Sequence, residues 1–200
     1  MYNSSTTYPG FSIAPLDTGL QQRIYGLSYH DNPYISYQDL RYLQILYCDF
    51  HGNTADGELI CNRIIASTLI EIFYSLYNAD YPIEKMHLID DYQADDDLSC
   101  LDNNSSCFNY RTIDQTDRLS MHAYGLAIDI NPFYNPYVTF VDQKEHVSLP
   151  GAEYYADRSK PLPYQINHQD LCYQLFTSHQ FQWGGDWTHC KDYHHFEFHP

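Results

Sequence analysis

The sequence predicts a single α+β domain. An amphipathic helical pattern runs from 62 to 77, and apolar or aromatic runs at 40–50, 83–89 and 125–130 are typical of strands. Hydrophobic residues make up 44% of the 200 residues, which is enough for a core, and we find neither an internal repeat nor a linker. Helices and strands that share one core give the α+β class.

Residues 1–34 are rich in Tyr, Ser, Thr, Asn, Pro and Gly, and we expect an irregular N-terminal arm there, followed by a domain at 35–200. The aromatic and apolar run at 40–50 predicts a strand, and HGNTADG at 51–57 predicts the turn after it. The helical segment follows, because its apolar residues recur every three or four positions. The run IEKMHLI after it predicts the next strand.

Three consecutive aspartates, Asp95–Asp97, lack the alternating spacing and the closing glutamate of a calcium-binding EF-hand loop. They favour the solvated start of a helix, where carboxylates interact well with the helix dipole. Farther along, 108–111, 125–130 and 195–198 predict short strands, and 167–178 predicts a second helix.

The charge of the chain excludes some partners. Ten Lys and Arg residues against 26 Asp and Glu give a formal net charge of −16, which repels the phosphates of nucleic acids and anionic membranes. No apolar run approaches the ~18 residues of a membrane span. The first residues do not resemble a signal peptide, which indicates either a cytosolic protein, released by lysis, or a chain whose leader has been removed.

The segment SMHAYGLAID, which begins at Ser120, combines residue types that bind metal ions. We expect His122 in a loop and Asp129 in a strand, with Gly125 allowing a tight turn between them. Alternation along the strand places Asp129 on the opposite face from its apolar neighbours. A carboxylate inside an apolar strand is costly when unpaired, so it needs a cation or hydrogen-bond donors. A metal ion would meet that need.

A second segment, WGGDWTHCKDYHHFEF near the C-terminus, supplies His195, with Asp192 three residues before it. Neighbouring residues of a strand point to opposite faces, so at most one of His194 and His195 should enter a given site. We expect His194 to face outward. A third segment, FNYR, places the guanidinium of Arg111 shortly before His122.

Together these motifs resemble a known family. Ser-x-His-x-x-Gly-x-Ala-x-Asp at 120–129, followed by Asp-x-x-His-Phe-Glu at 192–197, is similar to the zinc peptidases of the D-alanyl-D-alanine carboxypeptidase and L-alanyl-D-glutamate endopeptidase family. That family includes vancomycin-resistance carboxypeptidases and phage endolysins that act on peptidoglycan. The segments 103–111, 123–138 and 183–187 extend the resemblance to about half of the chain.

The resemblance implies a small antiparallel sheet that carries the zinc site, with helices packed on it, as in hedgehog-type proteins and D-alanyl-D-alanine peptidases. It implies that His122, Asp129 and His195 bind one catalytic zinc ion. Three protein ligands leave the fourth position for a water molecule, whose pKa zinc lowers to about 7.

Three further residues take catalytic roles by the same resemblance. Asp192 corresponds to the general base, Arg111 to the arginine that stabilises the oxyanion, and Ser120 to a serine near the substrate. An aspartate at 192, rather than a glutamate, resembles the endopeptidase branch. The residues alone leave two alternatives open: Asp192 orients a ligand histidine, and Arg111 pairs with one of the many carboxylates.

The six cysteines are too far apart in the sequence for the C-x2-4-C pair of a thiolate zinc site, which leaves buried thiols or disulfides. None corresponds to a ligand in the resemblance. Disulfides would indicate an oxidising compartment. Pairing nearest neighbours gives the hypothesis of three bridges, Cys48–Cys61, Cys100–Cys107 and Cys172–Cys190.

The resulting prediction is a monomeric zinc metallopeptidase that hydrolyses the peptidoglycan stem peptide or a muropeptide, as a D-Ala-D-Ala carboxypeptidase or an L-Ala-D-Glu endopeptidase. The alternative is a catalytically inactive, zinc-containing binding module of the same fold. We expect a periplasmic or secreted protein, the alternative being a cytoplasmic protein that is released by lysis.

Overall fold

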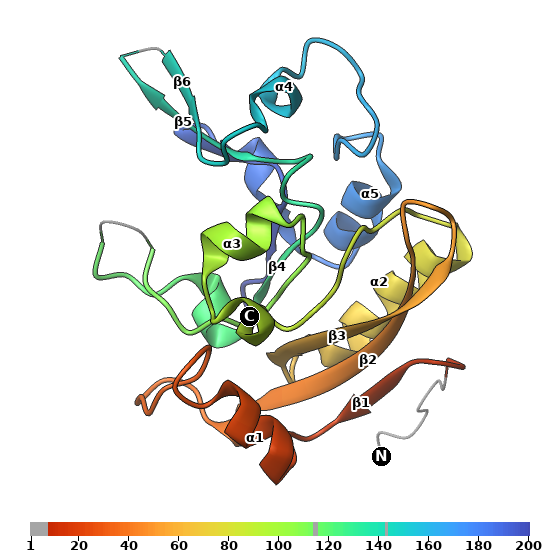
Figure 1. The fold of residues 1–200 in the computed structure, drawn as a ribbon, viewed down its shortest axis with the longest axis vertical. Coiled ribbons are helices and arrows are strands. Elements are labelled where there is room, and N and C mark those ends of the chain that lie inside the picture. The colour runs from red at the N-terminus through yellow and green to blue at the C-terminus, as the bar shows by residue number, and fades with distance from the viewer. Residues whose placement is uncertain (1–7, 114–115, 143) are drawn as a thin grey trace.

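The computed structural model describes residues 8–113, 116–142 and 144–200, and it confirms the α+β class (Figure 1). The described strands form three small antiparallel sheets of three strands each, where the sequence analysis expected one sheet. None of the helices in the described part of the chain has the length and apolar character of a membrane-spanning segment.

The first sheet has the order β1 (Ser12–Ala14), β2 (Leu40–Cys48), β3 (Thr54–Asn62). The predicted strand at 40–50 is confirmed as β2, but the turn after it is shorter than expected. The sequence of β3, TADGELICN, begins with residues typical of a loop, yet β3 pairs with β2 over its full length. Pairing with a strongly apolar neighbour therefore overrides the weak strand propensity of its first half.

The predicted amphipathic helix is confirmed as α2 (Ala66–Asn78), which starts a few residues later than expected. Its buried face, including Leu69 and Phe73, packs against β2 in the main hydrophobic core (Figure 1). The described part of the N-terminal arm contains β1 and α1 (Thr18–Ile24), whose Ile24 belongs to a second buried cluster. Asp17 caps α1 by accepting a hydrogen bond from Leu20 N at 2.8 Å.

The strands of the other two sheets alternate along the second half of the chain. The second sheet contains the segments predicted as strands at 125–130 and 195–198, while the third contains a hairpin that the sequence analysis missed. Their orders are β4 (Ala127–Asp129), β9 (His195–Glu197), β7 (Gln182–Trp183), and β6 (Lys144–Val147), β5 (Tyr137–Val141), β8 (Cys190–Asp192). Because β8 ends at Asp192 and β9 begins at His195, two residues carry the chain from the third sheet to the second.

The remaining helices are short. Asp95 caps the first of them by accepting from Leu98 N at 3.0 Å, so the acidic run is confirmed as a helix start. The second predicted helix is confirmed, with Asp170 as its cap. The described helices not yet given are α3 (Asp96–Leu101), α4 (Glu153–Ala156) and α5 (Leu171–Ser178), with 3-10 helices η1 (Tyr37–Asp39), η2 (Ile89–Tyr92), η3 (Met121–Tyr124) and η4 (Gly184–Asp186).

The strands predicted at 83–89 and 108–111 are wrong. Apart from Ile89, which begins η2, both segments form only isolated bridges or irregular backbone. In the first, asparagine side chains take the place of a neighbouring strand: Glu84 N donates to Asn131 Oδ1 at 3.0 Å, and His87 N donates to Asn104 Oδ1 at 2.8 Å. Backbone groups satisfied by side chains do not need a sheet.

The three proposed disulfides are also wrong, because all six cysteines are free and buried. Cys61 pairs with Arg41 in the β2–β3 hairpin, whereas Cys48 pairs with Thr54. The two cysteines are therefore seven residues apart along the hairpin, roughly 23 Å, and a disulfide spans less than about 7 Å between Cα atoms. Cys100 and Cys107 belong to different buried clusters. The cysteines therefore give no support for an oxidising compartment.

We predict that all six thiols react with a thiol reagent in denaturant without a reductant. The same reagent should react slowly with the native protein, since every cysteine is buried. A count of four or fewer thiols, rising to six after reduction, would contradict the structure.

Gly125 ends η3 with φ of +65°, and a Cβ there would lie 2.6 Å from the backbone N of Asn62. We predict that Gly125→Ala lowers the free energy of unfolding by about 3 kcal/mol or more, from left-handed strain and overpacking. Gly26 is the matched control, because its φ is +82° but nothing lies within 4 Å of a Cβ. Gly26→Ala should cost only about 1 kcal/mol in urea denaturation. Equal losses would show that the close approach to Asn62 is unimportant.

Candidate metal centre

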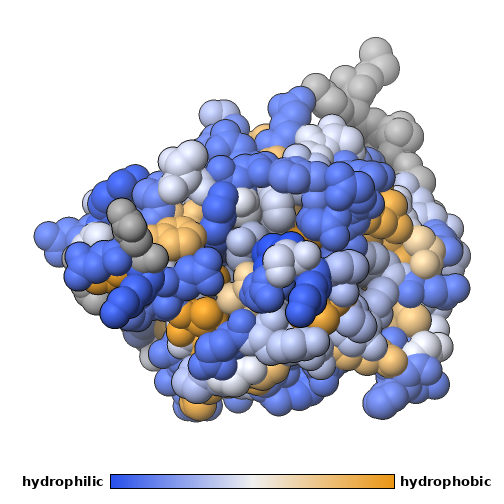
Figure 2. Space-filling model, turned by 90° about the horizontal axis from the view of Figure 1, so that it is seen from above, coloured by the Kyte–Doolittle hydropathy of each residue, from blue (hydrophilic) through white to orange (hydrophobic). Residues whose placement is uncertain are grey.

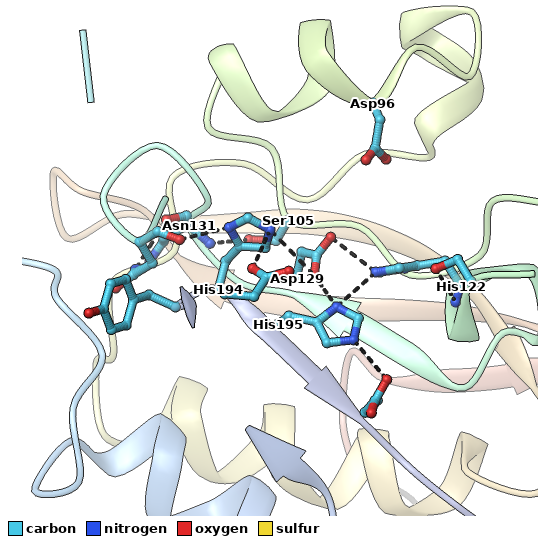
Figure 3. A network of polar contacts seen from close by, with 12 residues as sticks. Asp96, Ser105, His122, Asp129, Asn131, His194 and His195 are labelled. Atoms are coloured by element: carbon cyan, nitrogen blue, oxygen red, sulfur yellow. Dashed lines mark hydrogen bonds and ion pairs between the residues drawn. The ribbon is translucent and has the colours of Figure 1, made fainter. Parts of the chain in front are cut away.

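Three buried side chains from separate parts of the chain meet at one point of the second sheet (Figure 3). Asp129 of β4 and His195 of β9 are direct cross-strand partners, which brings Asp129 Oδ1 within 3.0 Å of His195 Nδ1. His122 of η3 approaches the pair, with Nε2 at 3.1 Å from Asp129 Oδ2 and 3.2 Å from His195 Nδ1. One donor atom from each residue lies within 4.8 Å of the others, so the group could hold a metal ion.

The short helix η3 sets the position of His122. Ser120 accepts a hydrogen bond from His122 N at 3.3 Å, which caps the helix, and Gly125 ends it. The carbonyl oxygen of His122 accepts from Asn109 N at 3.2 Å. Capping alone accounts for a serine two residues before the histidine, and a contact of Ser120 with substrate stays a prediction.

Hydrogen bonds also orient both imidazole rings. His122 Nδ1 donates to the carbonyl oxygen of Cys107, so Nε2 is left to face Asp129. Nε2 of His195 lies 3.2 Å from Glu197 Oε2, so Nδ1 is left to face Asp129. Such outer contacts fix the tautomer and orientation of metal-binding histidines. Glu197 has no role in the prediction from the sequence, although it lies two residues after His195, on the same face of β9.

The charges of the cluster favour a bound cation. Burial alone would raise the pKa of the Asp129 carboxyl, but the charges of His122 and His194 and hydrogen bonds from His122 and His195 hold it well below its usual range. Burial opposes a charged His195, yet hydrogen bonds with Asp129 and Glu197 raise its pKa to about 10. A metal ion that binds at His195 Nδ1 would displace the proton there. Two imidazoles and one carboxylate suit zinc.

Asp192 lies beside this cluster at the end of β8, with 14% of its side-chain surface exposed. His194 Nε2 is 2.9 Å from Asp192 Oδ1 and 3.9 Å from Asp129 Oδ1. The expectation that His194 faces outward is therefore wrong. Strand alternation does not apply to it, because residues 193–194 form a bend between β8 and β9. His194 and His195 both turn toward Asp129 (Figure 3).

Comparison with protein families finds one similarity, which covers part of the chain. Residues 114–198 match the family model of the D-alanyl-D-alanine carboxypeptidases. The resemblance that the motifs indicated is confirmed for this part of the chain, which contains the three cluster residues and Asp192. Comparison with curated proteins finds no match. Comparison with solved structures finds none either.

Arg111 lies outside the segment that matches the carboxypeptidase family. Its backbone is next to the matched segment, since its carbonyl oxygen accepts from Ser120 N at 3.1 Å. Its guanidinium Nη2 donates to Asp96 Oδ2 of α3 at 2.6 Å, and the Asp96 side chain points from α3 toward the cluster (Figure 3). Arg111 therefore pairs with a carboxylate, which was the alternative role that the sequence left open. Its contact with the substrate stays a prediction.

The WGGDW sequence of the carboxypeptidase-like segment packs directly behind the cluster. A Cβ on Gly184 would lie 2.7 Å from Cβ of Asp192 and 3.3 Å from Cβ of His195. Only glycine permits this approach. The ring of Trp187 lies 5.4 Å from the ring of His195, between centroids. In the sequence this segment supports only the resemblance, and its contacts with the site are visible only in the structure.

We predict that Glu197→Gln weakens zinc binding by about 10-fold to 100-fold, because it removes the carboxylate that orients His195. A competition titration with a chromophoric chelator measures the dissociation constant. Glu145→Gln is the control, since Glu145 lies exposed in β6. Equal zinc affinity of the two variants would contradict the role of Glu197.

Proposed function

We propose that the protein is a zinc metallopeptidase that hydrolyses a peptide bond in the peptidoglycan stem peptide. The observation that carries the proposal is the buried His122, Asp129 and His195 cluster with Asp192 beside it, in a segment that matches the D-alanyl-D-alanine carboxypeptidase family. Zinc held by these three side chains would polarise the scissile carbonyl and lower the pKa of a water molecule.

The protein's own residues would carry the proton transfers. The Asp192 carboxylate takes a proton from the attacking water and later delivers one to the amine that leaves. The Arg111 guanidinium, steadied by Asp96, stabilises the negative charge that develops on the carbonyl oxygen. A binding module without activity would not need an acid–base group beside the cluster.

The bond that is cleaved is part of the proposal. An aspartate at 192 favours an L-Ala-D-Glu endopeptidase over a D-Ala-D-Ala carboxypeptidase, by its resemblance to the endopeptidase branch. We place the monomeric enzyme in the periplasm or outside the cell, where its substrate lies. The face seen in Figure 2 is largely hydrophilic, with apolar side chains in small separate groups, in keeping with the net charge of −16.

We predict that Asp192→Asn lowers kcat for stem-peptide hydrolysis by about 100-fold or more, because general acid–base catalysis is lost. It should bind zinc as the unaltered protein does. His122→Ala should lose both zinc and activity. Mass spectrometry of digested muropeptides and metal analysis measure these effects. Loss of zinc from Asp192→Asn would give Asp192 a structural role, and a zinc-loaded protein that cuts no muropeptide would overturn the proposed function.

A further inference from the structure

Asn62 is a half-buried residue at the end of β3 that reaches the helix carrying His122. Its side-chain Nδ2 donates to the carbonyl oxygen of Tyr124 at 2.9 Å, and its backbone N donates to the carbonyl oxygen of Gly125 at 2.8 Å. Tyr124 is the last residue of η3, and Gly125 is its cap. Asn62 therefore binds two successive carbonyl groups where η3 ends. It lies outside the segment that matches the carboxypeptidase family.

The helix η3 is short and depends on contacts from outside. It consists of four residues in 3-10 geometry, in which hydrogen bonds are poorer than in an α-helix. The carbonyl groups at a helix end have no partner within the helix and need one elsewhere. The carbonyl oxygen of His122 accepts from Gly125 N at 2.9 Å, so a shift of Gly125 would also shift His122.

The first sheet gives Asn62 a firm position. β3 pairs with β2 over all nine of its residues, and the two strands form part of the main hydrophobic core. The other contacts that orient His122 outside the cluster come from irregular backbone, at Ser120, Cys107 and Asn109. Asn62 thus connects η3 to a long, regularly paired strand.

We propose that Asn62 is a positioning residue for the metal ligand His122. It fixes the end of η3 on the first sheet, and Nε2 of His122 is thereby kept facing Asp129 and His195. This role rests on the proposed zinc site. Outer contacts of metal ligands typically contribute 10-fold to 100-fold in metal affinity, and Asn62 acts through the backbone of η3, so we expect about 10-fold.

Two substitutions remove the donor of the Asn62 side chain. Asn62→Asp keeps the size and the oxygen that accepts from Ile64 N at 3.2 Å, but an ionised carboxylate cannot donate to Tyr124. Asn62→Ser adds no charge, and its side chain is too short to reach Tyr124. Asn78 is the matched control, because its Nδ2 donates to the carbonyl oxygen of Tyr74 at 2.8 Å in α2. It receives the same two substitutions.

The experiment measures the zinc dissociation constant by competition with a chelator and the stability of the metal-free protein in urea. It also records the visible absorption of protein loaded with Co²⁺, which binds the same donor types and whose spectrum depends on how its ligands are arranged. We expect both Asn62 variants to bind zinc about 10-fold more weakly, with an altered cobalt spectrum. Both Asn78 variants should match the unaltered protein in zinc affinity and in spectrum. If one Asn62 variant does not fold, the other decides.

Three results would overturn the inference. Unchanged zinc affinity in the Asn62 variants, with lower stability in urea, would give Asn62 a purely structural role. Weaker affinity with an unchanged cobalt spectrum would show that the ligands had kept their arrangement. Equal losses of affinity in the Asn78 variants would show a general effect of stability. In each case the unaltered protein still binds zinc. An unaltered protein that binds none overturns the proposed function, and the role of Asn62 falls with it.

Discussion

The pairing of Asp129 with His195 across β4 and β9 is the contact on which the site depends. It buries a carboxylate almost completely, and such a charge is costly unless cationic groups surround it. The structure meets that cost with histidines, which approach Asp129 from η3, from β9 and from the bend before β9. The same arrangement that stabilises the carboxylate presents nitrogen and oxygen donors to one point, which could hold a metal ion.

The short link between β8 and β9 places Asp192 beside the cluster. Asp192 and His195 are three residues apart but belong to different sheets, because the chain bends at 193–194. The β5–β8 pairing, in which Tyr137 is the partner of Asp192, fixes one end of this link, and the β4–β9 pairing fixes the other. Asp192, the proposed acid–base group, and the candidate metal cluster are thereby held by separate sheets with little freedom between them.

The sequence predicted the cluster better than the strands around it. His122, Asp129 and His195 could be found because their motifs resemble those of a zinc peptidase family, and the apolar alternation around Asp129 placed its carboxylate correctly. The strand predicted at 83–89 failed because asparagine side chains satisfy its backbone, which no local pattern reveals. His194 was misplaced because alternation holds only within a strand. The Cys48–Cys61 bridge failed because β3 was not foreseen.

The coordination of the bound metal tests the central claim most directly. X-ray absorption at the zinc edge, on protein loaded with one equivalent of zinc, should show nitrogen and oxygen neighbours at about 2.0–2.1 Å, two of them imidazoles. Asp129→Asn should weaken this binding, since it removes the buried charge. A sulfur neighbour at about 2.3 Å, or failure to retain zinc, would contradict the account, because it would assign the metal to the cysteines or to no site at all.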